Sequence, residues 1–261
     1  MLTPEHEHRI NVYRYCLSSP PLAQLPNMLT ADDLKEINAV LPDYPHHLPE
    51  YNGRLGIWYE HLWLAIVDSH PNWQLIASNY PIQEGKKTQG AIDLLIADHQ
   101  KQQIIHLELA VKFYMQFYQS GWQGWFGPNP TDQFSKKLAW MLTHQLPIGF
   151  HPTIQKLRLQ FPHYQFVQRM LMQGRLFTAG LRCTDGVWLR DSQLQGIIRG
   201  RYLQVTKNNW LTPQELAYQP LPEHINSVVM VYGQGQQMML VPDHWPMLIE
   251  AQDHPQVNIH T

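Results

Sequence analysis

Charged side chains interrupt two apolar segments in the first half of the sequence. Asp93 lies within the segment Gly90–Ile96, and Glu108 and Lys112 lie within the segment Ile104–Lys112. Both segments are typical of buried β-strands, where an unpaired carboxylate or ammonium is costly unless a partner compensates its charge. A divalent cation is a suitable partner for two carboxylates. Two acids and a lysine on adjacent strands therefore indicate a metal-dependent phosphodiesterase.

The second segment carries a polar row on one of its faces. Side chains of a strand alternate between the two faces of a sheet, so His106, Glu108, Ala110 and Lys112 share one face. The intervening apolar side chains share the other face, which we expect to be core. His106 is either a neighbour of the site or a structural residue. The alternative to a metal site is that Asp93 and Glu108 accept hydrogen bonds from backbone amides or pair with Lys112.

Two predicted helices carry further polar candidates. An apolar stripe predicts a helix over residues 53–69, and Glu60 lies at the edge of this stripe. From there its carboxylate either reaches the sheet or points into solvent. A second helix, predicted over residues 131–145, carries Lys137 at the edge of its apolar face.

The order of the predicted elements indicates an α/β fold with a mixed sheet. Two helices come first, and the second starts with a capping box between Thr30 and Asp33. After the helix of Glu60, a three-stranded meander starts at residues 73–84 and has the two acids on its second and third strands. The other predicted elements are an aromatic loop at 114–130, the helix of Lys137, a short helix opening at 212–215, and strands at 165–172, 175–179, 186–190, 201–206, 225–232 and 236–241.

Composition restricts the class of protein. The chain has 261 residues, 44% of them hydrophobic and 15% charged, which is sufficient for a core. Its two cysteines, Cys16 and Cys183, form no redox or zinc motif and favour a reducing compartment. The N-terminus lacks the features of a signal peptide, and the longest apolar run, residues 62–67, is too short for a membrane span. We therefore expect a soluble cytoplasmic protein with no membrane partner.

Basic residues are concentrated in one part of the chain. The net charge is −2, but residues 151–210 contain nine Lys and Arg and two acids. This excess either attracts phosphate groups or forms a solvated surface that the acidic ends of the chain balance.

The succession of a helix with Glu60, a strand with Gly-x-x-Asp93 and a strand with Glu108 and a downstream lysine resembles the PD-(D/E)xK nuclease superfamily. More narrowly, four segments resemble an uncharacterised bacterial family, domain-of-unknown-function family 1853, which is assigned to that superfamily. These segments are Gly53–Gly56, His106–Tyr114, Gly127–Asn129 and Val241–Pro246. The resemblance implies a restriction-endonuclease-like core with a mixed central sheet flanked by helices. We divide the chain into a helical segment (1–49), this core (50–180) and a β-rich C-terminal extension (181–261).

The resemblance also implies roles for individual residues. Asp93 and Glu108 would be the ligands of Mg²⁺ or Mn²⁺, and Glu60 would be the helix-borne acid that assists metal or water binding. The superfamily lysine usually stands two residues after the second acid, where this chain has Ala110. Lys112 would then supply the ammonium from further along the same strand face, or Lys137 would supply it from the following helix.

Three functions remain open at this point. The favoured one is a metal-dependent endo- or exonuclease that hydrolyses phosphodiester bonds of nucleic acid, with DNA as the expected partner. The second is a nucleic-acid-binding module of the same fold without turnover, which Ala110 supports. The third is a protein-interaction domain that uses the aromatic segment 114–130 and the β-rich C-terminal half.

Overall fold

Helices precede and interrupt the strands in the part of the chain that the computed structural model describes, which is residues 3–45, 47–85, 87–119, 122–179, 186–196, 202–212, 219–233 and 235–246. The helices are α1 (Pro4–Ser18), α2 (Ala31–Ala39), α3 (Leu55–Ser69), α4 (Phe134–Trp140) and α5 (Pro152–Arg158). A π-helical turn (Met141–Gln145) and a 3-10 turn (Leu146–Phe150) continue α4, and shorter 3-10 turns occupy Asp191–Gly196 and Lys207–Asn209. The strands are β1 (Trp73–Glu84), β2 (Lys87–Asp98), β3 (Gln103–Gln119), β4 (Trp122–Phe126), β5 (Gln165–Ala179), β6 (Val187–Arg190), β7 (Leu203–Val205), β8 (Gln219–Pro220), β9 (Val229–Gly233) and β10 (Gln236–Val241).

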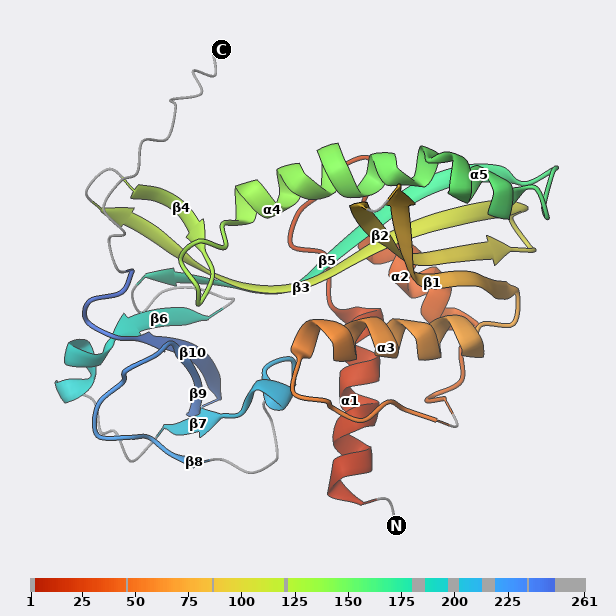
Figure 1. The fold of residues 1–261 in the computed structure, drawn as a ribbon. Helices are drawn as coiled ribbons and strands as arrows, with labels where there is room; N and C mark the ends of the chain where they lie inside the picture. The colour runs from red at the N-terminus through yellow and green to blue at the C-terminus, as the bar shows by residue number, and fades with distance from the viewer. Residues whose placement is uncertain are drawn as a thin grey trace.

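One mixed sheet contains all of these strands. Its order is β1-β2-β3-β5-β6-β10-β9-β7-β8, and β4 pairs with the end of β3. The first three strands form an antiparallel meander, and β5 lies parallel to β3. The connection from β4 to β5 contains α4 and α5, which lie on one side of these strands, while α1 and α3 lie on the other (Figure 1).

Apolar layers lie on both faces of β3. Leu107, Leu109 and Phe113 belong to one buried cluster with the apolar residues of α1 and α3. Ala110 and Tyr114, on the opposite face, pack with the turns that follow α4. β3, the strand that contains Glu108, is therefore covered by helices on both sides.

Several predicted elements are confirmed. β1 has the predicted bounds, and α3 and the antiparallel meander form where the sequence indicated them. The capping box is present, because the Thr30 N–H donates to Asp33 Oδ2 at 2.7 Å and the Asp33 N–H donates to Thr30 Oγ1 at 3.1 Å. Among the described residues, no helix has the length and apolar character needed to cross a membrane.

The aromatic segment 114–130 is mostly a β-hairpin, so its prediction as a loop was wrong. β3 continues to Gln119, and β4 returns along it with Phe126 opposite Met115. Phe117 and Phe126 are buried and contact each other edge-to-face. Burial of alternate aromatic side chains favours an extended chain over an irregular loop.

The later part of the chain also differs from the prediction. The strands expected at 165–172 and 175–179 are one strand, β5, which continues through Gly174 in a backbone conformation with φ of +131° that only glycine adopts readily. Helix α5 was not predicted. The short helix expected from Thr212 falls, beyond its first residue, outside the described residues.

Candidate functional site

β2 and β3 separate beside the two predicted acids. The strands pair as far as Leu94 and Leu107. Asp93 precedes Leu94 in β2, just beyond the last backbone pair. Its Oδ2 accepts a hydrogen bond from the Leu109 N–H at 2.8 Å, so the Asp93 side chain, and not the β2 backbone, is the partner of β3 at this point. We call this point, between Asp93 of β2 and Glu108 of β3, the fork.

Glu108 is completely buried and is held by the imidazole of His106 and the amide of Gln145. Its Oε1 lies 2.6 Å from His106 Nε2, and its Oε2 accepts a hydrogen bond from Gln145 Nε2 at 2.6 Å. Gln168 Nε2 lies 3.3 Å from the second ring nitrogen of His106. In the tautomer with a proton on Nε2, His106 therefore accepts from Gln168 and donates to Glu108. Among the described residues, no Lys or Arg forms an ion pair with Glu108.

The carboxylates of Asp93, Glu108 and Glu60 interact electrostatically with one another at the fork. Burial, followed by the charge of Glu108, raises the pKa of Asp93 to about 8, although the Leu109 N–H opposes this shift. Burial also raises the pKa of Glu60 on α3, although the neighbouring His61 opposes this shift. The charge of Glu108 adds to the rise, and the charge of Lys137 reduces it. The structure thus brings Glu60, Asp93 and Glu108 together from a helix and two strands. Their mutual repulsion is the condition that a bound cation would relieve.

The two candidate lysines have different partners. Lys112 Nζ lies 2.6 Å from Asp132 Oδ2, and Tyr114 donates a hydrogen bond to the other oxygen of the same carboxylate. Lys137 Nζ donates to Gln145 Oε1 at 2.7 Å. Burial and the charge of Lys112 lower the pKa of Lys137, while Asp93 and Glu108 oppose this shift. Lys137 is therefore the ammonium that faces the fork carboxylates, and Lys112 lies beside it in a separate ion pair.

Gln145 links Lys137 to Glu108, and sequence reasoning missed it. Its side-chain oxygen accepts from Lys137 and its nitrogen donates to Glu108. In a regular α-helix, residues eight apart are rotated by about 80° from each other around the helix axis. The π-helical turn Met141–Gln145 uses more residues per turn and so brings Gln145 onto the face of Lys137. Nothing in the amino-acid pattern indicated this turn.

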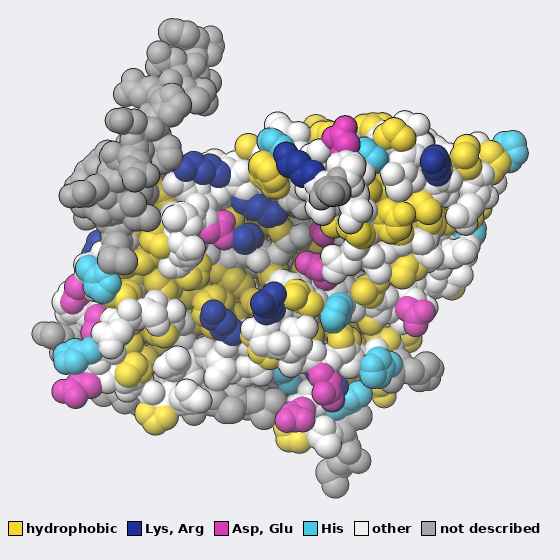
Figure 2. Space-filling view, in the orientation of Figure 1, with side chains coloured by type: hydrophobic (Ala, Val, Ile, Leu, Met, Phe, Trp, Pro, Cys, Tyr) yellow, Lys and Arg dark blue, Asp and Glu magenta, His cyan; other side chains and the backbone are white. Residues whose placement is uncertain are grey.

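The side chains at the fork could hold a small divalent cation. Among the described residues, no group of three or more His, Cys, Asp and Glu side chains is arranged to enclose a metal. Mg²⁺ keeps several waters and often binds through only one or two carboxylates. Asp93 Oδ1 accepts no hydrogen bond from any described residue, so it is free to bind a cation beside Glu108. Figure 2 shows acidic and basic side chains close together on the face between α4 and α3.

A family model matches nearly the whole chain. Its description is "Domain of unknown function (DUF1853)", and it covers residues 5–256. No curated protein and no solved structure matches the chain. The match includes α3, the fork, α4 and the strands beyond β5, but its description assigns no activity to them.

Proposed function

The chain belongs to the DUF1853 family, and we propose that it is a metal-dependent nuclease that hydrolyses phosphodiester bonds of nucleic acid, with DNA as the favoured substrate. Its core at residues 50–180 would be restriction-endonuclease-like, of the PD-(D/E)xK type. The meeting of Asp93, Glu108, Glu60 and Lys137 at the fork carries this proposal. The succession α3-β1-β2-β3-β4-α4 agrees with it, apart from the additional short strand β4. The low cysteine content favours the reducing cytoplasm as its location.

Asp93 and Glu108 would hold Mg²⁺ or Mn²⁺. The cation supplies positive charge for the phosphoryl oxygens and for the attacking water. His106 and Gln145 keep the Glu108 carboxylate in one orientation through the two 2.6 Å contacts. Neither contact comes from a Lys or Arg side chain.

Lys137 is the proposed source of the ammonium that acts on substrate. Its Nζ is oriented by Gln145, and its lowered pKa reflects a partly buried position close to Lys112. An ammonium in this position would orient the attacking water or stabilise the charge that develops on the phosphoryl group. Lys137 would thus replace the lysine that is absent at Ala110. Glu60, from the other side of the fork, would assist in holding the cation or its water.

A nucleic-acid-binding module without turnover is the second candidate. The ion pair of Lys112 with Asp132 at 2.6 Å favours it, because this pair removes the strand lysine from the fork. The protein-interaction alternative has fewer aromatic contacts available in the hairpin of β3 and β4, since Phe117 and Phe126 are buried and Tyr118 is exposed.

Cleavage assays on matched lysine variants test the proposal. We expect Mg²⁺- or Mn²⁺-dependent cleavage of single- or double-stranded DNA or RNA, and its loss in Asp93→Asn. Lys137→Met should lower the rate by roughly 100-fold, as expected for loss of a group that transfers or orients a proton. Lys112→Met should have a smaller effect, and Lys136→Met, an exposed neighbour in α4, should have none.

The outcomes of these assays distinguish the three candidate functions from one another. Cleavage that persists in Asp93→Asn would remove the metal site from the fork. Binding of nucleic acid that weakens with salt, without cleavage by any variant, would favour the inactive module. Absence of binding at every salt concentration would favour the protein-interaction domain.

A further inference from the structure

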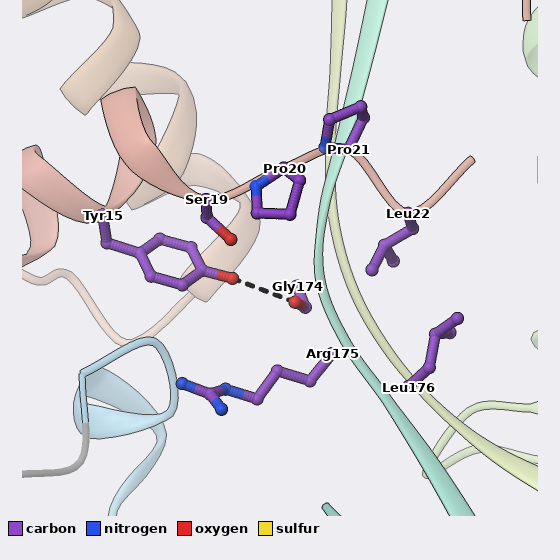
Figure 3. Close-up of a pocket in the computed structure, with 8 residues that line it drawn as sticks. All are labelled: Tyr15, Ser19, Pro20, Pro21, Leu22, Gly174, Arg175 and Leu176. Carbon is purple, nitrogen blue, oxygen red and sulfur yellow. Dashed lines mark hydrogen bonds between the residues drawn. The ribbon is translucent and has the colours of Figure 1, made fainter. Parts of the chain in front are cut away.

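A cavity lies beside β5, and its polar side chains are on the side of the sheet covered by α1. Its volume is about 370 Å³. The end of α1, the link Pro20–Pro21 and the β5 residues around Arg175 form its walls (Figure 3). In the pairing of β3 with β5, Arg175 lies opposite Phe113, whose side chain packs in the same cluster as the apolar residues of α1. Lys112, whose side chain is on the other face of β3, lies opposite Gly174. The cavity is therefore distinct from the fork.

Arg175 brings an uncompensated cation into this cavity. Its Nε is buried and has no hydrogen-bond partner among the described residues. The residues that line the cavity include no acid. A buried guanidinium N–H without an acceptor is unfavourable, and a ligand oxygen would remove this cost. Figure 3 shows the Arg175 side chain extending towards Tyr15.

The Tyr15 hydroxyl group beside Arg175 is fixed in place. Tyr15 donates a hydrogen bond to the Gly174 carbonyl at 3.0 Å, and Ser19 lines the cavity beside Tyr15. Burial raises the pKa of Tyr15, so the phenol stays protonated at neutral pH. The polar side of the cavity therefore contains a cation and two neutral hydroxyl groups, without a negative charge that would repel an anion.

The walls of the cavity are preformed. The Leu22 N–H donates to the Met172 carbonyl at 2.8 Å, which fixes the chain after Pro20–Pro21 along β5. Pro20 and Pro21 form the apolar part of the lining beside Ser19, while Leu22 and Leu176 line the cavity from the other side of β5 (Figure 3). A preformed cavity that combines a few polar groups with apolar lining residues is typical of small-ligand sites, because little conformational entropy is lost on binding.

We propose that this cavity binds a phosphate monoester, with Arg175 contacting the phosphate oxygens and the link Pro20–Pro21 contacting the rest of the ester. A guanidinium presents several N–H groups in a plane that matches two oxygens of a phosphate. The absence of an acid in the lining favours a dianion over a neutral ligand, and the volume exceeds that of a bare ion. The same group occurs in a free nucleotide and at the phosphorylated end of a nucleic-acid strand. The inference does not depend on the nuclease proposal.

Calorimetric titration of the full chain in the presence of EDTA tests this inference. The ligands are adenosine 5′-monophosphate, adenosine, and one oligodeoxynucleotide with either a 5′-phosphate or a 5′-hydroxyl. We expect adenosine 5′-monophosphate to bind and adenosine to fail. Arg175→Gln should weaken binding at least about tenfold, as expected for loss of a charged hydrogen bond. Arg14→Gln, an exposed arginine of α1, should leave it unchanged.

The oligonucleotide pair identifies the source of the phosphate. Tighter binding of the 5′-phosphorylated strand than of the mononucleotide, lost in Arg175→Gln, assigns the cavity to strand ends. Tighter binding of adenosine 5′-monophosphate than of the 5′-phosphorylated strand assigns the cavity to free nucleotides. Asp93→Asn should keep the phosphate affinity, so failure of the nuclease proposal would not affect this result.

Two results would overturn the inference. One is phosphate binding of equal strength in wild type and Arg175→Gln, provided that the variant gives the circular dichroism spectrum of a folded chain. The other comes from nuclear magnetic resonance of the wild-type chain, in which the Arg175 Nε–H signal should shift as adenosine 5′-monophosphate is added. A signal that does not move at saturating ligand excludes Arg175 as the contact, even if the variant fails to fold.

Discussion

Asp93 carries its negative charge at a cost to the folded chain. Burial and the neighbouring carboxylates raise its pKa from 3.8 to about 8. Between these two values, the folded chain binds a proton that the unfolded chain does not bind. The destabilising effect of Asp93 is therefore absent below about pH 4 and increases as the pH rises towards 8.

The variant Asp93→Asn should therefore be more stable than the wild type in the presence of EDTA. Asparagine is uncharged and can still accept the Leu109 N–H, so we expect a gain of roughly 2 kcal/mol at pH 8.5 and almost none at pH 4.5. Urea denaturation at the two pH values measures it. Asp68→Asn, an exposed position of α3, is the control and should show little change. A gain that is equal at both pH values would contradict the shifted pKa.

The acids of the site could be predicted from the sequence, but the network around them could not. Asp93 and Glu108 are identifiable because a single acid in an apolar strand is unusual. Glu60 could be predicted as a candidate because it lies at the edge of the apolar stripe of a helix. The pairing of Lys137 with Gln145 depends on a π-helical turn, and that of Lys112 with Asp132 depends on tertiary packing. Neither leaves a periodic pattern in the sequence.

Among the elements, β5 depends on one glycine. Gly174 has φ of +131° and lies against the backbone of Lys112, whose carbonyl oxygen a Cβ atom would overlap. Gly174→Ala should therefore lower the free energy of unfolding by roughly 3 kcal/mol or more.

Gly56→Ala is the matched control for Gly174→Ala in a thermal or urea denaturation series. Gly56 lies in α3, and nothing is within 4 Å of the position where its Cβ would be. Alanine should stabilise this helix by roughly 0.5–1 kcal/mol. Equal losses in both variants would show that the backbone of β5 adapts to the added methyl group.

The helix α2 depends on its reciprocal cap. Thr30→Ala removes the hydroxyl that accepts the Asp33 N–H and should lower the free energy of unfolding by about 1 kcal/mol. Thr30→Ser keeps a hydroxyl and should retain most of the stability. Chemical denaturation of the three proteins measures the difference, and equal loss in both variants would indicate that the methyl group of Thr30 is the stabilising part.

Local patterns explain which elements were predicted correctly. The capping box and the apolar stripe of α3 are short-range signals, and the structure has both. The hairpin of β3 and β4 was missed because its aromatic side chains become a core only through distant partners. Phe117, for example, contacts Trp188 and Trp245 at ring-centroid distances of 5.9 and 6.0 Å. Such contacts join residues about 70 and 130 positions apart, which no local window detects.

At the scale of the whole molecule, the three segments divided by the sequence analysis share one core. The largest buried cluster contains Leu17 from the first segment, Leu62 from the second and Trp210 from the third. Trp210 contacts Phe113 edge-to-face at 5.1 Å, and the His8 side chain lies 3.0 Å from the Asn208 carbonyl. The sheet also continues from β5 into β6. These contacts favour cooperative unfolding of all three segments.

Leu17→Ala should therefore destabilise the C-terminal strands although it lies in α1. Leu17 is 2% exposed, so its truncation should cost roughly 2–4 kcal/mol. Hydrogen exchange measured by mass spectrometry should show the same loss of protection in β9 and β10 as in α3, since a cooperative unit opens as a whole. The exposed Arg14→Ala should change neither. Loss of protection confined to α1 and α2 would mean that the first segment unfolds independently, and the shared cluster would then not couple the segments.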